Sequence, residues 1–130
     1  MSVLLDTLVW LWMLAAPERL SPAARELVEN VDTKLLLSAA SSWEIAIKYS
    51  LGRLAIPEPP QRYVPERMRA TGVNALAIEH TQALRVSALE PHHRDPFDRL
   101  LVAQSQVEGA PLLTADPIFG RYDVETIRAA

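Results

Sequence analysis

The chain of 130 residues contains no cysteine, and this absence excludes several kinds of chemistry. Without cysteine the protein forms no disulfide and has no thiolate nucleophile, and a zinc site would lack its commonest structural ligand. The three histidines, His80, His92 and His93, form no H-E-x-x-H motif or similar arrangement. We therefore do not expect a zinc enzyme.

The sequence also lacks an excess of positive charge and any long hydrophobic run. Its net charge of −3 argues against a broad basic surface for nucleic acid, although it is compatible with a local basic rim. The apolar run at residues 8–16 is far shorter than the roughly 20 residues that cross a bilayer. Asp6 interrupts the apolar N-terminal stretch and no Lys or Arg precedes it, which argues against a signal peptide. We expect a cytoplasmic protein without membrane contact.

The apolar content is that of an ordinary globular protein. Hydrophobic residues make up 49% of the chain and charged residues 22%, so neither a disordered nor a membrane class is indicated. A chain of this length is sufficient for one hydrophobic core and short for two. We expect a single domain over residues 1–130.

Short apolar runs alternate with helical patterns along the chain. The runs that predict buried strands are residues 2–5, 34–38, 73–78, 111–114 and, more weakly, 124–127. The segments that predict helices are residues 7–14, 21–31, 41–52, 57–72, 79–89 and 95–109, with glycine at the end of three of them. This alternation predicts a three-layer α/β/α sandwich with a central parallel sheet. In such sheets, ligands bind beyond the carboxyl ends of the strands.

Acidic residues occur at the element boundaries where such a site would form. Asp6 ends the first strand, Glu44 lies in the first turn of the helix after the second strand, and Asp116 follows the strand at 111–114. Asp95 and Asp98 open the helix that leads into that strand.

Each acid, taken alone, also fits an ordinary helix cap. Asp6, Asp95 and Asp116 precede or begin helical turns, and Asp98 falls at a position where a carboxylate suits the helix dipole. In the segment that starts at Ser41, the serine and Glu44 form the pattern of a capping box.

Taken together, the acids indicate a metal site. Capping needs one polar residue for each helix, and it does not require acids at several strand ends along one edge of the sheet. Converging carboxylates raise one another's pKa, so the arrangement is unfavourable unless a cation neutralises it. Oxygen ligands without thiolates suit Mg²⁺ or Mn²⁺, and such sites are commonly completed by substrate phosphates. The pattern therefore predicts metal-dependent hydrolysis of phosphoesters.

The ordered motifs LLDT, SSWEIAIK, DPFDRLLVAQ and LLTADPIF resemble those of PIN-domain nucleases, and more narrowly the VapC-type toxins of toxin–antitoxin pairs. The resemblance extends over the whole chain. It implies a PIN-like fold, a Mg²⁺ or Mn²⁺ site, endoribonuclease activity on RNA, a cognate antitoxin and a homodimer. It also implies that the metal site and catalysis depend on Asp6, Glu44, Asp98 and Asp116. Thr114 matches a Ser or Thr often found two residues before the last acid.

Several further residues are candidates for supporting roles. Asp95 belongs to an HRDPFDR form of the motif and is expected to start the helix and support the site from its edge. Lys48, one turn after Glu44, either contacts RNA or forms a surface ion pair. Arg94 and Arg99 flank the proposed site and are candidates for contacts with phosphate.

Other polar and aromatic residues are ambiguous in the sequence. His92 and His93 either contact phosphate beside the proposed site or lie in a solvated loop, and the solvated loop is favoured. Arg62, Arg67 and Arg69 either line an RNA groove or form the polar face of a helix, and the polar face is favoured. Trp10 and Trp12 lie about 200° apart around a helix, so one is expected in the core while the other either contacts a partner or is covered within the chain.

Three alternatives to a nuclease fit parts of the sequence. A phosphatase of the haloacid-dehalogenase type needs a second acid two residues after the first, where this chain has Leu8. The second alternative is a receiver-like or other non-catalytic module that binds Mg²⁺; a receiver site needs an acidic pair at the first strand, where only Asp6 is found, and a lysine after the last long strand, where this chain has none. A PIN-like scaffold in which the acids serve only as caps would bind no metal.

Overall fold

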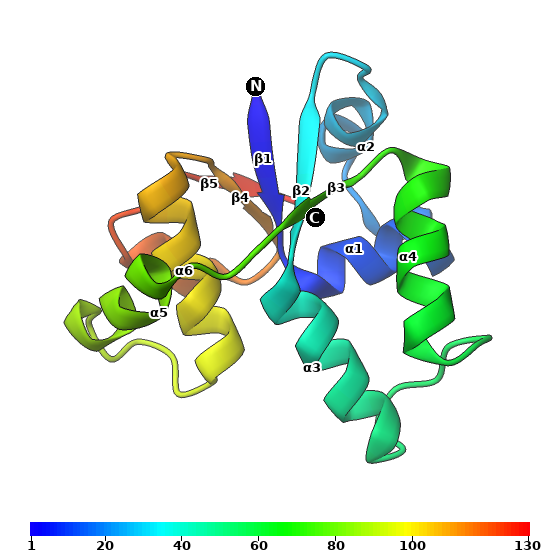
Figure 1. Cartoon of the computed structure of the whole chain (residues 1–130). Helices are drawn as coiled ribbons and strands as arrows, with labels where there is room; N and C mark the ends of the chain where they lie inside the picture. The colour runs from blue at the N-terminus through cyan, green and yellow to red at the C-terminus, as the bar shows by residue number, and fades with distance from the viewer.

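The computed structural model describes residues 1–130 and contains one five-stranded parallel sheet (Figure 1). The strands are β1 (Ser2–Leu5), β2 (Lys34–Ser38), β3 (Asn74–Leu76), β4 (Leu112–Thr114) and β5 (Thr126–Arg128). The helices are α1 (Thr7–Ala15), α2 (Pro22–Glu29), α3 (Ala39–Ser50), α4 (Pro60–Thr71), α5 (His80–Arg85) and α6 (Pro96–Glu108). Three 3₁₀ turns, η1 (Pro17–Arg19), η2 (Val86–Ala88) and η3 (Pro117–Arg121), complete the chain. The predicted α/β/α sandwich is confirmed.

The sheet order is β3-β2-β1-β4-β5, and every neighbouring pair is parallel. The chain runs outward from β1 through β2 to β3, and then crosses to the other side of β1 to form β4 and β5. The strand order therefore reverses between β1 and β4. In open α/β sheets, ligand sites form at the carboxyl ends of the strands beside such a reversal.

Alternate residues of the central strands enter two separate apolar clusters, one on each face of the sheet. Val3 and Leu5 of β1 pack in the larger cluster with residues of α1, α2, α3 and α4, whereas Leu4 packs in the cluster formed with α6 and η3. This alternation follows from the two-residue period of a strand. The two clusters are the interfaces between the three layers.

The tryptophans of α1 both lie on the larger cluster. Trp10 is completely buried, which confirms the prediction that one of the pair packs inside. Trp12 is half-buried against the same cluster, and the guanidinium of Arg19 lies 5.7 Å from its ring centroid. Trp12 is thus largely covered within the chain.

The predicted caps of several helices are present in the structure, whereas the predicted cap of α3 is not. Ser21 caps α2, and the predicted terminal glycines Gly52, Gly72 and Gly109 all have positive φ. The predicted cap of α3 at Ser41 is wrong: α3 begins earlier, and the side chain of Ser38 accepts the hydrogen bond from the amide of Ala40.

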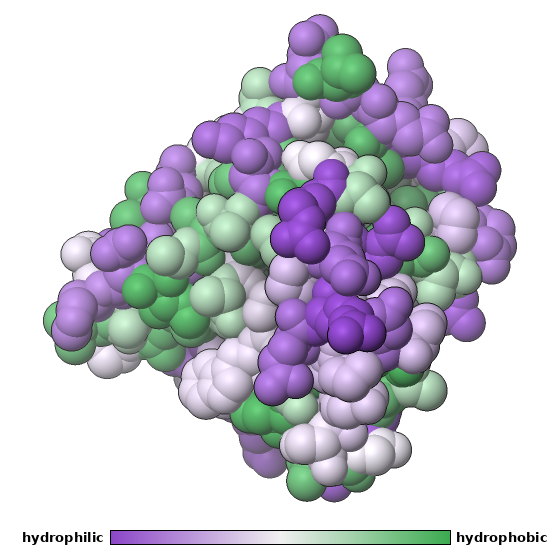
Figure 2. All heavy atoms as spheres, turned by 45° about the vertical axis from the view of Figure 1, so that its right-hand side comes forward, coloured by the Kyte–Doolittle hydropathy of each residue, from purple (hydrophilic) through white to green (hydrophobic).

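The polar face predicted for α4 is present in the structure. Arg62 and Arg69 are exposed, whereas Arg67 is half-buried. The Nε of Arg62 lies 3.8 Å from a carboxylate oxygen of Glu58. Figure 2 brings the α4 side of the molecule forward and shows hydrophilic side chains gathered down the middle of this face. None of the helices has the length and apolar character required to span a bilayer.

A buried polar chain joins β2 to α5 and α6. Gln104 of α6 is completely buried; its amide oxygen accepts from the Ser38 hydroxyl, and its amide nitrogen donates to the side-chain oxygen of Gln82 at 3.1 Å and to the carbonyl of Ala77 at 3.2 Å. The amide nitrogen of Gln82 in turn donates to Glu108 at 3.0 Å. This network holds α5 against α6.

We predict that Gln104→Ala lowers the free energy of unfolding by about 3 kcal/mol, because it creates a cavity and removes both the acceptor of the Ser38 hydroxyl proton and the donor to the Ala77 carbonyl. Urea denaturation measures the change. Gln106→Ala, on a more exposed face of the same helix, is the control and should cost less than about 1 kcal/mol. Equal losses in the two variants would contradict a stabilising role for the network.

Candidate metal centre

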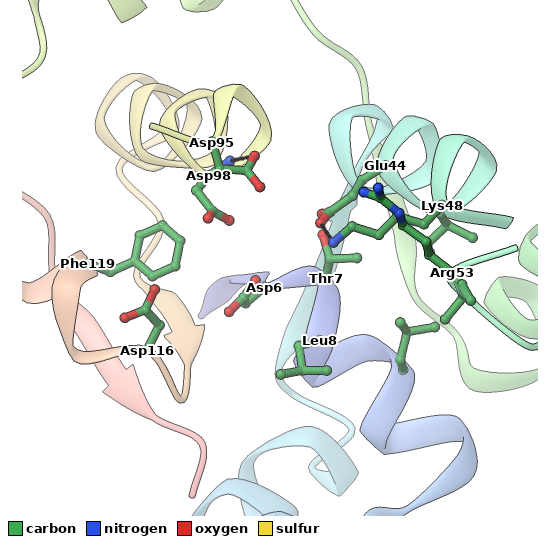
Figure 3. Close-up of a pocket in the computed structure, with 13 residues that line it drawn as sticks. Asp6, Thr7, Leu8, Glu44, Lys48, Arg53, Asp95, Asp98, Asp116 and Phe119 are labelled. Atoms are coloured by element: carbon green, nitrogen blue, oxygen red, sulfur yellow. Dashed lines mark hydrogen bonds and ion pairs between the residues drawn. The ribbon is translucent and has the colours of Figure 1, made fainter. Parts of the chain in front are cut away.

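The carboxyl ends of β1 and β4 open into a cavity of about 370 Å³ that five acidic residues line. These are Asp6, Glu44, Asp95, Asp98 and Asp116. They come from the end of β1, from α3, from the start of α6 and from the turn after β4, and the carboxylates face a common space (Figure 3). The structure therefore brings together the four acids of the predicted site and the supporting Asp95.

Asp6 is directed into the cavity and does not cap α1, so the capping interpretation is wrong for this residue. Its side chain makes no capping hydrogen bond and instead accepts one from the Thr114 hydroxyl at 2.8 Å. Burial raises the pKa of Asp6, the Thr114 hydrogen bond lowers it, and the charge of Glu44 raises it. The hydrogen bond from Thr114 thus fixes one oxygen of the Asp6 carboxylate.

Asp95 and Asp98 have separate roles at the start of α6. One oxygen of Asp95 accepts from the amides of Phe97 and Asp98, at 2.7 and 3.3 Å, which confirms its role as the cap. The Asp98 carboxylate is therefore not needed to cap the helix. Burial, followed by the charge of Asp95 and those of the other acids in the cavity, raises the pKa of Asp98 to about 7.

Glu44 forms the side of the cavity that α3 provides. The Lys48 ammonium donates to its Oε2, while Oε1 is buried without a hydrogen-bond partner. The pKa of Lys48 is raised, chiefly by this hydrogen bond. A buried carboxylate oxygen without a partner is unfavourable unless a ligand such as a cation satisfies it.

Asp116 both caps η3 and faces the cavity. Its Oδ1 accepts from the amide of Ile118 at 2.9 Å, and its amide donates to Thr114 at 3.0 Å. Its Oδ2 lies 3.0 Å from Nε2 of His93. Asp116 therefore caps η3 with one carboxylate oxygen and faces the other acids with the second.

The prediction that His93 lies in a solvated loop is wrong. Its side chain is only 7% exposed and is hydrogen-bonded to Asp116, whereas the neighbouring His92 pairs with Glu90 near the surface. No spacing in the sequence indicates this contact, because 23 residues separate His93 from Asp116. Arg53, which also lines the cavity, was likewise missed.

The two arginines predicted to contact RNA lie outside the residues that line the cavity. Arg99 donates from its guanidinium to the carbonyls of Val86, Leu89 and Glu90, and so fixes the loop before α6. Arg94 is exposed in that loop. Lys48 does line the cavity, although it also forms the predicted ion pair with Glu44.

The donor set fits a hard divalent cation. Carboxylate oxygens dominate the cavity, and such ligands suit Mg²⁺ or Mn²⁺. One group in particular, formed by one ligand atom each from His93, Asp98 and Asp116, has all its atoms within 4.8 Å of one another. The unpartnered oxygen of Glu44 and the raised pKa of Asp98 both mark positions where a bound cation would be favourable.

The model of the PIN domain family matches residues 3–125. The chain belongs to the PIN-domain family. Over 118 residues it is 32% identical to ribonuclease VapC22 of Mycobacterium tuberculosis, covering 88% of this chain and 87% of that protein. Over 56 residues it is 54% identical to ribonuclease VapC16 of the same organism, but that match spans only 40% of VapC16 and 43% of this chain.

The solved structure of VapBC2 from Rickettsia felis, bound to a DNA fragment from its promoter, has the same fold as this PIN domain. The TM-score is 0.73 with 13% sequence identity, and both chains are covered completely. The resemblance to VapC-type PIN proteins is thus confirmed. Because the family is established, the receiver-like alternative is not retained.

The raised pKa values predict that the metal-free PIN domain loses stability as the pH rises. In the folded chain the pKa of Asp98 is about 7, whereas its ordinary value is 3.8, so the folded state retains a proton that the unfolded chain releases. This contribution to stability is fully present below about pH 4 and is lost as the pH rises through 7. Asp6, whose pKa is also raised, acts in the same direction.

We therefore expect the Tm of the protein in EDTA to fall by several degrees between pH 5.5 and pH 8, as differential scanning fluorimetry would show. Asp98→Asn should show a much smaller fall, because asparagine does not titrate. Asp32→Asn, which removes an exposed carboxylate outside the cavity, is the control and should follow the wild type. The same slope in Asp98→Asn and wild type would contradict the assignment.

Proposed function

We propose that this PIN domain is a Mg²⁺- or Mn²⁺-dependent endoribonuclease and the toxin of a toxin–antitoxin pair. The observation that carries the proposal is the convergence of four carboxylates on one cavity, with a buried oxygen of Glu44 left without a partner. The ribonuclease names of the two mycobacterial relatives support RNA as the substrate class.

Asp6, Glu44, Asp98 and Asp116 are the residues proposed to hold the ion and to be required for catalysis. When bound in such a site, a divalent ion lowers the pKa of a water nucleophile and stabilises the leaving oxygen of a phosphodiester. Thr114 keeps the Asp6 carboxylate in place through its hydrogen bond. Asp95 holds the start of α6, so that Asp98 stays directed into the cavity.

Cationic side chains on the α3 side of the cavity are suited to the RNA backbone. Lys48 is 47% exposed and lines the cavity together with the exposed Arg53. Contacts of this kind bind phosphate without reading the base sequence. We propose Lys48 and Arg53 as phosphate contacts. Arg94, in the loop before α6, is a candidate that lies farther from the cavity.

Apolar residues at the cavity suit the binding of an antitoxin. Leu8 is 49% exposed, and it lines the cavity with Leu11 and Leu54. An exposed apolar surface next to an acidic cavity is typical of a protein-binding site. A relative by structure, from Klebsiella pneumoniae, was solved as a toxin–antitoxin complex. The homodimer implied by the family resemblance remains a prediction.

We predict that Asp98→Asn lowers metal-dependent RNA cleavage by more than about 100-fold while the protein stays folded. Loss of an outer-shell partner costs a metal site roughly 10- to 100-fold, and loss of a direct ligand should cost more. Cleavage of total RNA in the presence of Mn²⁺, with ends mapped by sequencing, measures the effect, and EDTA should abolish wild-type cleavage.

Asp32→Asn is the matched control for this experiment, because it removes the same charge from an exposed residue that does not line the cavity. It should cleave at the wild-type rate. Cleavage by Asp98→Asn at that rate would exclude Asp98 from the mechanism. Wild-type cleavage that EDTA does not affect would exclude metal dependence.

A further inference from the structure

His93 is enclosed between aromatic rings at the edge of the cavity. Its ring stacks on Tyr122, with the planes 4° apart and the centroids 5.5 Å apart, and it lies 4.5 Å from the ring of Phe119. With its side chain 7% exposed, the imidazole has little freedom to rotate. Its polar atoms are therefore held in fixed directions.

The hydroxyl of Tyr122 is placed to form a hydrogen bond with Nδ1 of His93. This hydroxyl accepts from the backbone amide of His93 at 2.8 Å, and it also lies 3.2 Å from Nδ1 of the same residue. A hydroxyl has one proton to donate. An ionised carboxylate only accepts, so Nε2, which faces Asp116 at 3.0 Å, carries the proton of the neutral ring, and the Tyr122 hydroxyl then donates its own proton to Nδ1.

That proton is directed at Asp116. Nε2 of His93 lies 3.0 Å from Oδ2 of Asp116 and 4.0 Å from Oδ2 of Asp98, so it donates to the first and is too distant for a hydrogen bond to the second. Because Oδ1 of Asp116 accepts from the amide of Ile118, both oxygens of this carboxylate are fixed.

We propose that His93 is a positioning residue that orients the Asp116 carboxylate through a proton on Nε2, and that Tyr122 supports this tautomer by donating to Nδ1. The inference rests on the proposed function, in which Asp116 helps to hold the metal ion. Hydrogen bonds from outer residues keep a metal's carboxylate ligands in place, and their loss typically weakens metal binding by 10- to 100-fold.

Direct ligation of the ion by His93 is the competing role. His93, Asp98 and Asp116 place ligand atoms close enough for a shared ion, and a neutral imidazole is a common metal ligand in proteins. Ligation through Nε2 requires that this atom carry no proton. The position of the proton therefore separates positioning from ligation.

The test compares His93→Gln with His93→Phe. The glutamine amide nitrogen reaches approximately the position of Nε2 and donates a hydrogen bond, whereas phenylalanine keeps the packing between the rings and has no donor. Isothermal titration of the full chain with Mn²⁺ should show affinity reduced by about 10- to 100-fold in His93→Phe, and by much less in His93→Gln. Cleavage of RNA at limiting Mn²⁺ should follow the same order, and unfolding in EDTA shows whether each variant is folded.

Nitrogen NMR of the wild-type ring, without metal and then with Mg²⁺, provides a second measurement that needs no variant. We expect a protonated Nε2 and an unprotonated Nδ1 in both states. A proton on Nδ1, or loss of the Nε2 proton on addition of Mg²⁺, would overturn the proposal, as would equal Mn²⁺ affinities of the two folded variants.

Failure of this inference is distinguishable from failure of the proposed function. If the wild type neither binds Mn²⁺ nor cleaves RNA, the metal-dependent function is wrong whatever the His93 variants do. If the wild type does both and His93→Phe matches it in both, the function stands and the positioning role is wrong.

Discussion

Repulsion among the carboxylates at the end of the sheet is the constraint on which the rest of the site depends. Two like charges about 4 Å apart near a protein surface repel by roughly 4 kcal/mol. Here burial of Asp98 is the larger cause and the repulsion adds to it, so the pKa of Asp98 rises to about 7. A folded chain tolerates such a cluster only if other interactions hold each acid in place, or if a cation neutralises the charges.

The surrounding structure supplies a separate fixed contact for three of the acids. Thr114 donates to Asp6, Lys48 donates to Glu44, and the amide of Ile118 donates to one oxygen of Asp116. The Asp98 carboxylate has no such donor, since Nε2 of His93 lies 4.0 Å away, beyond hydrogen-bond distance. Among the four acids, Asp98 also has the most strongly raised pKa. Asp98, whose negative charge is least stabilised by neighbouring groups, is therefore the acid whose charged form a bound cation would stabilise most.

The central strands were predictable because their determinants are local. β1 and β2 coincide with the predicted runs at 2–5 and 34–38, since each contains three successive apolar residues that are all buried. The edge strands were predicted less well. β3 has three residues where six were expected, because only one neighbour pairs with it, and β5 begins two residues later than predicted.

The candidate site was predictable in its acids but not in the contacts between them. Strand ends in a parallel sheet share one edge, so the convergence of Asp6 and Asp116 follows from the order of the elements. The partners of these acids depend on tertiary contacts between distant segments: 108 residues separate Thr114 from Asp6, and 23 separate His93 from Asp116. The start of α3 was also ambiguous in the sequence, because Ser38 and Ser41 are equally good N-cap residues and lie only one helical turn apart.

The most direct test of the central claim is a crystal of this protein grown with Mn²⁺, measured for the anomalous signal of the metal. The account predicts an anomalous peak inside the cavity, within ligand distance of the Asp98 carboxylate and of at least one other of the four acids. A cavity that contains only water at a saturating concentration of Mn²⁺ would contradict it.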